Sequence, residues 1–278
     1  MLHAEQGLGD TIQFVRYVPM VIERGGRVVL CVQPELRRLL EKFPGAEAVA
    51  SRPGDLPACK AYRYLMDLPG TFGTSVDSIP NPVPYVEADT ELREVWRKRI
   101  EESERSLGRG TVPLGGLSPY RGLRVGIAWA GRVTHPNNSF RSMKLGMFQP
   151  LGSVEGVTFF SLQKGPGAKE AGSPPGGMKL VDVTAGIADF ADTAGLVANL
   201  DLVISVDSAV AHLAGAMGKR VWILVPYCPD WRWMLGRDDS PWYPTAKLFR
   251  QVKRGDWESV VERVKLQLLR LTKEGVRL

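Results

Sequence analysis

The first segment that could do chemistry is a glycine-rich turn near the N-terminus, Glu5-Gln6-Gly7-Leu8-Gly9-Asp10-Thr11. An amphipathic helix is predicted to follow it, and the free N–H groups at a helix start suit an anion. The residues leave two interpretations of Asp10 open. It is either the cap of this helix, because aspartate is a preferred cap, or a carboxylate at a sheet edge that removes a proton from a bound hydroxyl.

The second segment, residues 201–215, has the sequence DLVISVDSAVAHLAG. It predicts a buried strand that ends at Asp207 and a helix of small residues that begins at once. Ser208 and Ala209 would present backbone N–H groups with little obstruction, which suits a diphosphate. His212 shares a helical face with Ser208. The alternative for His212 is a packed ring that bonds a backbone carbonyl.

The third segment is a polar, basic loop over residues 131–144, which follows a predicted strand. Arg132, Arg141 and Lys144 would neutralise charge that builds up on a leaving diphosphate. Lys164, directly after the next strand, is a further candidate. The alternative for each of these cations is a solvated surface position.

Several other chemistries lack their residues. The chain has no acidic pair at a strand end and no histidine cluster, and Cys31, Cys59 and Cys228 have no metal-ligand spacing. No GxxxxGK[ST] or GxSxG motif is present, and the first turn lacks the third glycine of a dinucleotide fingerprint. We therefore expect no metal and no cofactor, with helix dipoles and basic side chains in the role of a metal.

The elements that must position these segments alternate along the chain. Strands are predicted over residues 27–32, 123–130, 157–163, 202–206 and 221–225, and helices over 34–43, 90–107, 208–217 and 256–271. Near-continuous apolar strands that alternate with helices indicate parallel sheets covered on both faces. The tryptophans and tyrosine of residues 231–243 could stack a base or a sugar, but core packing is the commoner role and is favoured for Trp233.

Composition sets the remaining expectations. Residues 1–115 and 121–255 are predicted as two α/β domains joined by a Gly- and Pro-rich linker over 108–120, with a last helical segment over 256–278. Neither a membrane span nor a leader peptide is predicted, which favours the cytoplasm. The net charge of +6 fits an anionic ligand or peripheral association with an acidic membrane, while no motif organises the cations for nucleic acid. The first strand looks clipped, so we expect the natural protein to begin earlier.

Together, HAEQGLGDTIQFVRYVP, GIAWAGR, FFSLQKGP, DLVISVDSAVAHLAGAMGK and PDWRWM resemble a bacterial glycosyltransferase domain that follows tetratricopeptide repeats. That domain is similar to the ADP-heptose:lipopolysaccharide heptosyltransferases of glycosyltransferase family nine. The resemblance implies an α/β GT-B fold of two Rossmann-like halves and an inverting, metal-free transfer. It implies that the acceptor, which is a saccharide, a lipid-linked molecule or a protein, binds the first half. The second half would hold the nucleotide-sugar donor.

The resemblance also implies roles for single residues. Asp10 would be the general base in an acceptor-side turn with Gln6, Gly7 and Gly9. The donor phosphates would meet Asp207, Ser208, Ala209 and His212, with Arg141 as the basic partner, although heptosyltransferases tend to have lysine there. The C-terminal helix would cross back to the first half.

Two departures from the family are visible. Ala209 replaces a glycine, and tetratricopeptide repeats are missing from this chain. A non-catalytic GT-B scaffold that binds a nucleotide sugar or docks a partner is kept as the rival hypothesis. A sugar-nucleotide epimerase or hydrolase is the third.

Overall fold

The computed structural model of the chain describes residues 1–106 and 122–274. Two parallel β-sheets organise these residues, as the apolar strands predicted. The first sheet has the order β3 (Ala46–Ala50), β2 (Val28–Cys31), β1 (Leu2–His3) and β4 (Arg63–Tyr64). The second has the order β10 (Ala246–Arg250), β9 (Val221–Val225), β8 (Leu202–Val206), β5 (Leu123–Ala128), β6 (Val157–Ser161) and β7 (Leu180–Val181). The short strands β3, β4, β7 and β10 were not predicted.

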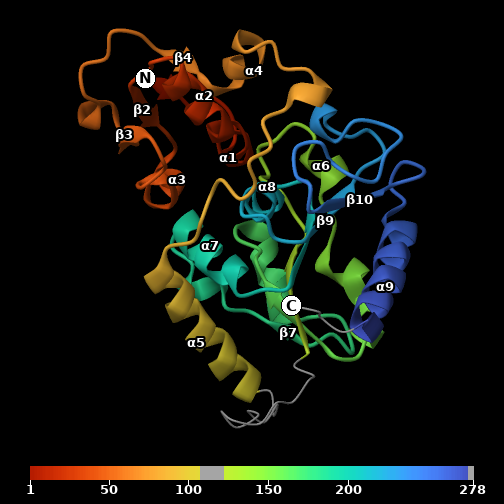
Figure 1. Cartoon of the computed structure of the whole chain (residues 1–278). Helices are drawn as coiled ribbons and strands as arrows, with labels where there is room; N and C mark the ends of the chain where they lie inside the picture. The colour runs from red at the N-terminus through yellow and green to blue at the C-terminus, as the bar shows by residue number, and fades with distance from the viewer. Residues whose placement is uncertain (107–121, 275–278) are drawn as a thin grey trace.

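Helices connect and cover the strands (Figure 1). The α-helices are α1 (Leu8–Phe14), α2 (Val18–Glu23), α3 (Pro34–Leu40), α4 (Leu68–Thr71), α5 (Thr90–Ser106), α6 (Asn138–Arg141), α7 (Phe190–Ala198), α8 (Ala209–Ala216) and α9 (Trp257–Glu274). The 3₁₀ helices are η1 (Val15–Tyr17), η2 (Pro53–Asp55), η3 (Leu65–Asp67), η4 (Val76–Ser78), η5 (Leu145–Ser153), η6 (Pro166–Gly172), η7 (Thr184–Gly186) and η8 (Trp231–Trp233).

Alternate residues of the second sheet feed two separate cores. Val203 of β8 faces a core that also holds residues of α1, α5, α7 and α8, so this core is shared by both halves of the molecule. Leu202 and Ile204 face the other core, which η5 and α9 cover. The contact between α1 and α8 is therefore part of a continuous apolar interior and holds the two sheets together.

Two parts of the predicted domain division differ from the structure. Helix α9 does not cross back to the first half: its apolar residues pack on η5 and β10, on the outer face of the second sheet. Figure 1 shows α9 beside β10, away from the first sheet. Helix α5 was placed in the first half, but Trp96 and Ile100 bury its apolar side against α7 of the second half. The predicted linker over 108–120 lies outside the described residues.

The chain leaves the first half earlier than predicted. The amide of Tyr85 already donates to the carbonyl of Ala216 at the end of α8, at 3.0 Å. The first sheet with its helices thus ends well before residue 115, and residue 85 lies against the second half. The two motifs of interest, after β1 and after β8, are brought together where α1 meets α8.

Candidate active site

The turn after β1 fixes the position of Asp10. Gly7 is the N-cap of α1, and its N–H donates to Oδ2 of Asp10 at 2.7 Å. Asp10 is therefore the third residue of the helix and closes the turn from inside, instead of being the cap residue. Its side chain keeps 23% exposure. The interpretation of Asp10 as the N-cap is therefore wrong, although one of its oxygens stabilises the helix start, and its role as a proton acceptor stays a prediction.

The neighbouring glycine allows α1 to lie against α8. A Cβ built on Gly9 would lie 2.6 Å from Cδ2 of His212, closer than any ordinary carbon contact. Gln6 has a different part in the turn: its side chain is exposed, and its carbonyl accepts from Nε2 of Gln33 at 2.9 Å. The turn therefore also determines how closely the two halves approach each other.

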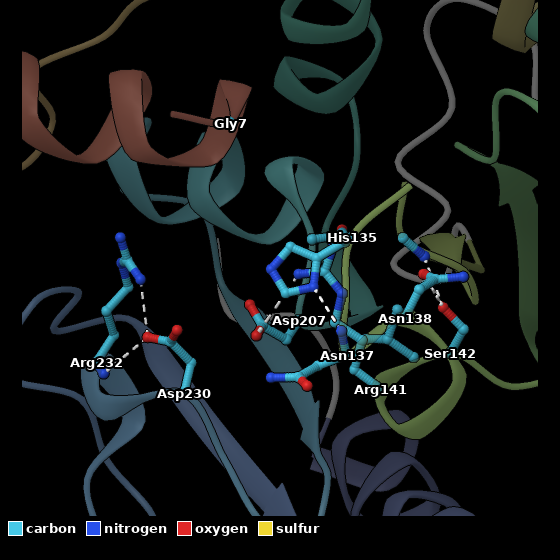
Figure 2. Close-up of polar contacts among 12 residues, drawn as sticks. Gly7, His135, Asn137, Asn138, Arg141, Ser142, Asp207, Asp230 and Arg232 are labelled. Carbon is cyan, nitrogen blue, oxygen red and sulfur yellow. Dashed lines mark hydrogen bonds and ion pairs between the residues drawn. The ribbon is translucent and has the colours of Figure 1, made fainter. Parts of the chain in front are cut away.

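Arg232 of η8 reaches Asp10 from the second half. Its Nη2 pairs with Oδ1 of Asp10, its Nη1 donates to Oδ1 of Asp230 at 2.8 Å, and its Nε donates to Oε1 of Gln13 at 2.6 Å. Figure 2 shows Arg232 beside Asp230. The sequence patterns did not single out this arginine. The one signal for it in the sequence is the segment PDWRWM, which contributes to the family resemblance.

The second predicted segment folds as expected. Strand β8 ends at Val206, Asp207 follows in a buried position, and Ser208 is the N-cap of α8. The first helical bonds run from the amides of Ala211 and His212 to the carbonyl of Ser208, so the earlier amides, including that of Ala209, are available to a ligand. The hydroxyl of Ser208 lies 2.9 Å from Oγ of Ser205 and already has a hydrogen-bond partner. Burial raises the pKa of Asp207, although Arg141 opposes the shift.

His212 is buried and neutral. Its Nδ1 lies 2.8 Å from the hydroxyl of Tyr243, and its ring stacks on Trp233 with centroids 5.3 Å apart. Burial lowers the pKa of His212 well below 6.5, and nearby arginines, Arg232 first, lower it further. The 3.9 Å separation between Nε2 and Oδ1 of Asp207 is therefore no ion pair, because the imidazole carries no charge at neutral pH. The predicted carbonyl partner is replaced by a tyrosine hydroxyl.

Arg141 is the basic residue of the third segment that reaches the others. It ends α6, lies against Gly131, and places Nη1 3.9 Å from Oδ2 of Asp207. Its Nε is buried and has no hydrogen-bond partner among the described residues. Figure 2 shows Arg141, Asp207 and His135 lying together. An arginine with an unused donor beside the start of α8 is suited to bind a phosphate oxygen.

His135 lies in the same loop, between Arg132 and Arg141 in the chain. Burial and then Arg141 lower the pKa of His135, while Asp230 and Asp10 partly offset this. The turn of the first half reaches the same place through Gly9, which precedes Asp10 and lies directly against His212 of α8. The side chains predicted to act on the acceptor and on the donor meet at one place.

Two predicted cations do not join this group. Nζ of Lys164 donates to the carbonyls of Thr184 and Ile187, at 3.1 and 3.0 Å, and so anchors a loop. Lys144 is exposed, and its side chain makes no hydrogen bond or ion pair with the described residues. A phosphate contact of either lysine stays a prediction, because a strand-end position does not determine the direction of a long side chain. Arg132 is likewise exposed.

The described residues also form a hollow away from this group, and they lack both a metal-ligand cluster and a membrane-spanning helix. A surface hollow lined by α5 and the segment around η7, including Arg99, Glu102 and Gly186, is separate from the group around Asp10. In residues 1–106 and 122–274, no group of three or more His, Cys, Asp or Glu side chains is arranged to hold a metal ion. Over the same residues, no helix combines the length and apolarity needed to cross a membrane.

The architecture defines a class of protein. Two parallel α/β sheets that meet through α1 and α8 form the GT-B fold, and solved structures confirm it. A glycosyl transferase family 9 protein from Veillonella parvula superimposes with a TM-score of 0.63 at 13% identity, covering 99% of this chain and 97% of the other. The E. coli ADP-heptose lps heptosyltransferase II does so with a TM-score of 0.62 at 10% identity, covering 97% and 98%.

Sequence comparisons give the family. Residues 155–231, which include β8, α8 and the start of η8, match the family described as Glycosyltransferase family 9 (heptosyltransferase). The chain is also 28% identical to Protein FlbA of Caulobacter vibrioides over 285 residues, 95% of this chain. It spans 45% of the length of that relative. This part of the chain is thus similar to glycosyltransferase family 9, and the predicted tetratricopeptide repeats stay a prediction.

Proposed function

We propose that the chain transfers a sugar from a nucleotide-diphosphate sugar to an acceptor hydroxyl, with inversion and without a metal. The observation that supports this most is the contact of α1, which carries Asp10, with α8, whose start lies beside Asp207 and Arg141. A base and an anion site at one place are what a direct displacement at an anomeric carbon needs.

The proposed step balances as a single displacement. The acceptor hydroxyl gives its proton to Asp10, and its oxygen forms a bond to the anomeric carbon. The bond from that carbon to the diphosphate oxygen breaks, and the diphosphate leaves with the electron pair. The free amides before Ala211 and the guanidinium of Arg141 would stabilise its charge. Attack from the face opposite the leaving group inverts the anomeric centre.

The donor is proposed by class. The E. coli relative is named as an ADP-heptose heptosyltransferase, so ADP-heptose belongs in the first panel, together with other ADP-, GDP- and UDP-sugars. The acceptor would be a saccharide, a lipid-linked molecule or a protein. Because nucleotide sugars are cytoplasmic metabolites, the proposal also places the reaction in the cytoplasm. The net charge of +6 is compatible with peripheral contact with an acidic membrane.

Turnover of this panel, with the Asp10→Asn variant beside the wild type, tests the proposal. The variant keeps the shape of Asp10 but cannot take up the proton, so transfer should fall at least a hundredfold, while nucleotide affinity changes less than threefold. If no sugar nucleotide is bound or consumed by the wild type, the proposal is wrong.

One observation favours the rival function, a nucleotide-sugar-binding scaffold. Arg232 already pairs with Asp10, so part of the carboxylate is engaged before any substrate binds. A scaffold would bind a nucleotide with normal affinity and show no transfer, and Asp10→Asn would then change nothing measurable. Product analysis with and without acceptor would reveal an epimerase or a hydrolase instead.

A further inference from the structure

Arg232 has an unusual environment for a cation at the contact between the halves. Its side chain is only 8% exposed. It is bonded by two residues of the first half, Gln13 and Asp10, and by Asp230 of its own half. A guanidinium has five N–H donors in a fixed plane, so these three partners define its orientation. It is a buried bridge between the halves that ends on the proposed base.

Two aromatic rings lie beside the guanidinium of Arg232. Its guanidinium carbon lies 4.7 Å from the ring centre of Trp231 and 5.7 Å from that of Phe14. Asp230 also caps η8, because its carboxylate accepts from the backbone N–H of Arg232 at 3.1 Å. Arg250 of β10 holds the far side of the loop through the carbonyls of Trp233 and Met234. Arg232 is therefore held both at its backbone and at its guanidinium group.

The contacts of Gly7 and Arg232 with the Asp10 carboxylate leave acceptor sites on it for a substrate hydroxyl. A carboxylate offers about four acceptor sites on its two oxygens. Gly7 N–H occupies a site on Oδ2, and Arg232 occupies a site on Oδ1. The remaining sites lie on a side chain that is 23% exposed and whose rotation is prevented at both oxygens. The two contacts thus orient the carboxylate without using all its acceptor capacity.

We propose that Arg232 is a positioning residue that holds the Asp10 carboxylate in the direction required for proton transfer. The inference rests on the proposed function, since it gives Asp10 a base role. It goes beyond that function because both halves contribute to the base. Helix α1 carries Asp10, and Arg232 of η8 orients it. Contact between the halves then assembles the base.

Kinetics of Arg232→Gln against a matched control test this inference. The control is Arg38→Gln, because Arg38 also forms an ion pair between the halves, with Asp189 and Asp192 at 2.8 and 2.6 Å. Arg232→Gln should lower kcat at least tenfold, with less than a threefold change in ADP affinity and in the donor KM. Arg38→Gln should leave kcat within twofold of the wild type.

Chemical rescue gives a second measurement that does not depend on the glutamine variant folding well. Arg232→Ala removes the guanidinium that lies beside the rings of Trp231 and Phe14 and leaves its three acceptors without that partner. Millimolar guanidinium should raise kcat of this variant severalfold, whereas sodium at equal ionic strength should not. Arg232→Lys should be intermediate, because a single ammonium cannot span all three acceptors.

The outcomes separate the two proposals. If the wild type transfers sugar and Asp10→Asn does not, while Arg232→Gln has wild-type or higher kcat, the positioning role is overturned and the proposed function stands. If ADP affinity falls together with kcat, Arg232 binds phosphate or supports the fold, and the inference is again wrong. If the wild type itself turns over no donor, the proposed function has failed first.

Discussion

Replacing Gly9 by alanine has two effects of opposite sign on the free energy of unfolding. Gly9 is the second residue of α1, where alanine should favour the helix by about 0.5–1 kcal/mol relative to glycine. The new Cβ would, however, lie 2.6 Å from Cδ2 of His212. Carbon atoms pack at about 3.5–4.0 Å, so α1 or the imidazole must move by roughly 1 Å.

His212 has little freedom to move. Its ring stacks on Trp233 and bonds the hydroxyl of Tyr243, and it is 5% exposed. Overpacking at such a site costs about 1–3 kcal/mol, which outweighs the helix preference. We therefore expect Gly9→Ala to be destabilised by roughly 0.5–2 kcal/mol. At about 2–4 °C per kcal/mol for a chain of this size, Tm should fall by a few degrees.

The same displacement should affect catalysis, because Asp10 is the next residue. A misplacement of about 1 Å can cost up to about a hundredfold in rate. Thermal unfolding and donor turnover check both effects. The control is Gly70→Ala in α4, where a Cβ would have nothing within 4 Å, so it should match the wild type. A Gly9→Ala protein with unchanged or higher Tm and full turnover would refute the close approach of α1 and α8.

The charged groups give three further predictions. Burial lowers the pKa of His212 below 6.5, so its stabilising contribution is present above about pH 6.5 and is lost as the pH falls; denaturant titrations should show that His212→Gln reduces this loss. Arg38 is 44% exposed, and Arg38→Gln should lower the free energy of unfolding by about 1 kcal/mol or less, and less still in high salt, as denaturant titrations at two salt concentrations would show. Arg141→Gln should raise the donor KM about ten- to a hundredfold in steady-state kinetics, since hydrogen bonds to charged groups contribute about 1.5–3 kcal/mol.

The sequence predicted well whatever depends on local periodicity. Strand β8 and strand β9 have the predicted bounds, and the helix predicted over 208–217 is α8. Apolar runs and small-residue helices carry this information within a few residues. The short strands β4 and β7 have two residues each, too few for any periodicity to show.

Contacts between residues far apart in the chain could not be predicted from local sequence patterns. Arg232 and Asp10 are 222 residues apart in the chain, and no spacing rule links them. Lys164 was placed at the right sheet edge, but its flexible side chain bonds two backbone carbonyls instead. Helix α9 was placed by the family resemblance, while its own apolar stripe matches the outer face of the second sheet. Contacts of this kind depend on the assembled tertiary structure.

The arginines at this contact also bear on how the chain could manage without a metal. Arg16 is 1% exposed and is bonded by carbonyls of Gln13 and Trp242 and by the hydroxyl of Tyr85, so within the described chain no carboxylate pairs with it. Burial opposes its charge, but the tyrosines around it more than compensate, and the pKa of Arg16 is raised. Arg16 thus keeps its charge beside neutral His212.

Burial meanwhile raises the pKa of Asp207, while Arg141 opposes the shift. With Arg141 adjacent and the helix amides open, the balance at this position favours an anion over a cation. A carboxylate set built for a divalent ion would require the opposite arrangement, with several ionised oxygens facing one point. In the proposed function, the protein's own fixed cations would supply the field that a departing diphosphate needs.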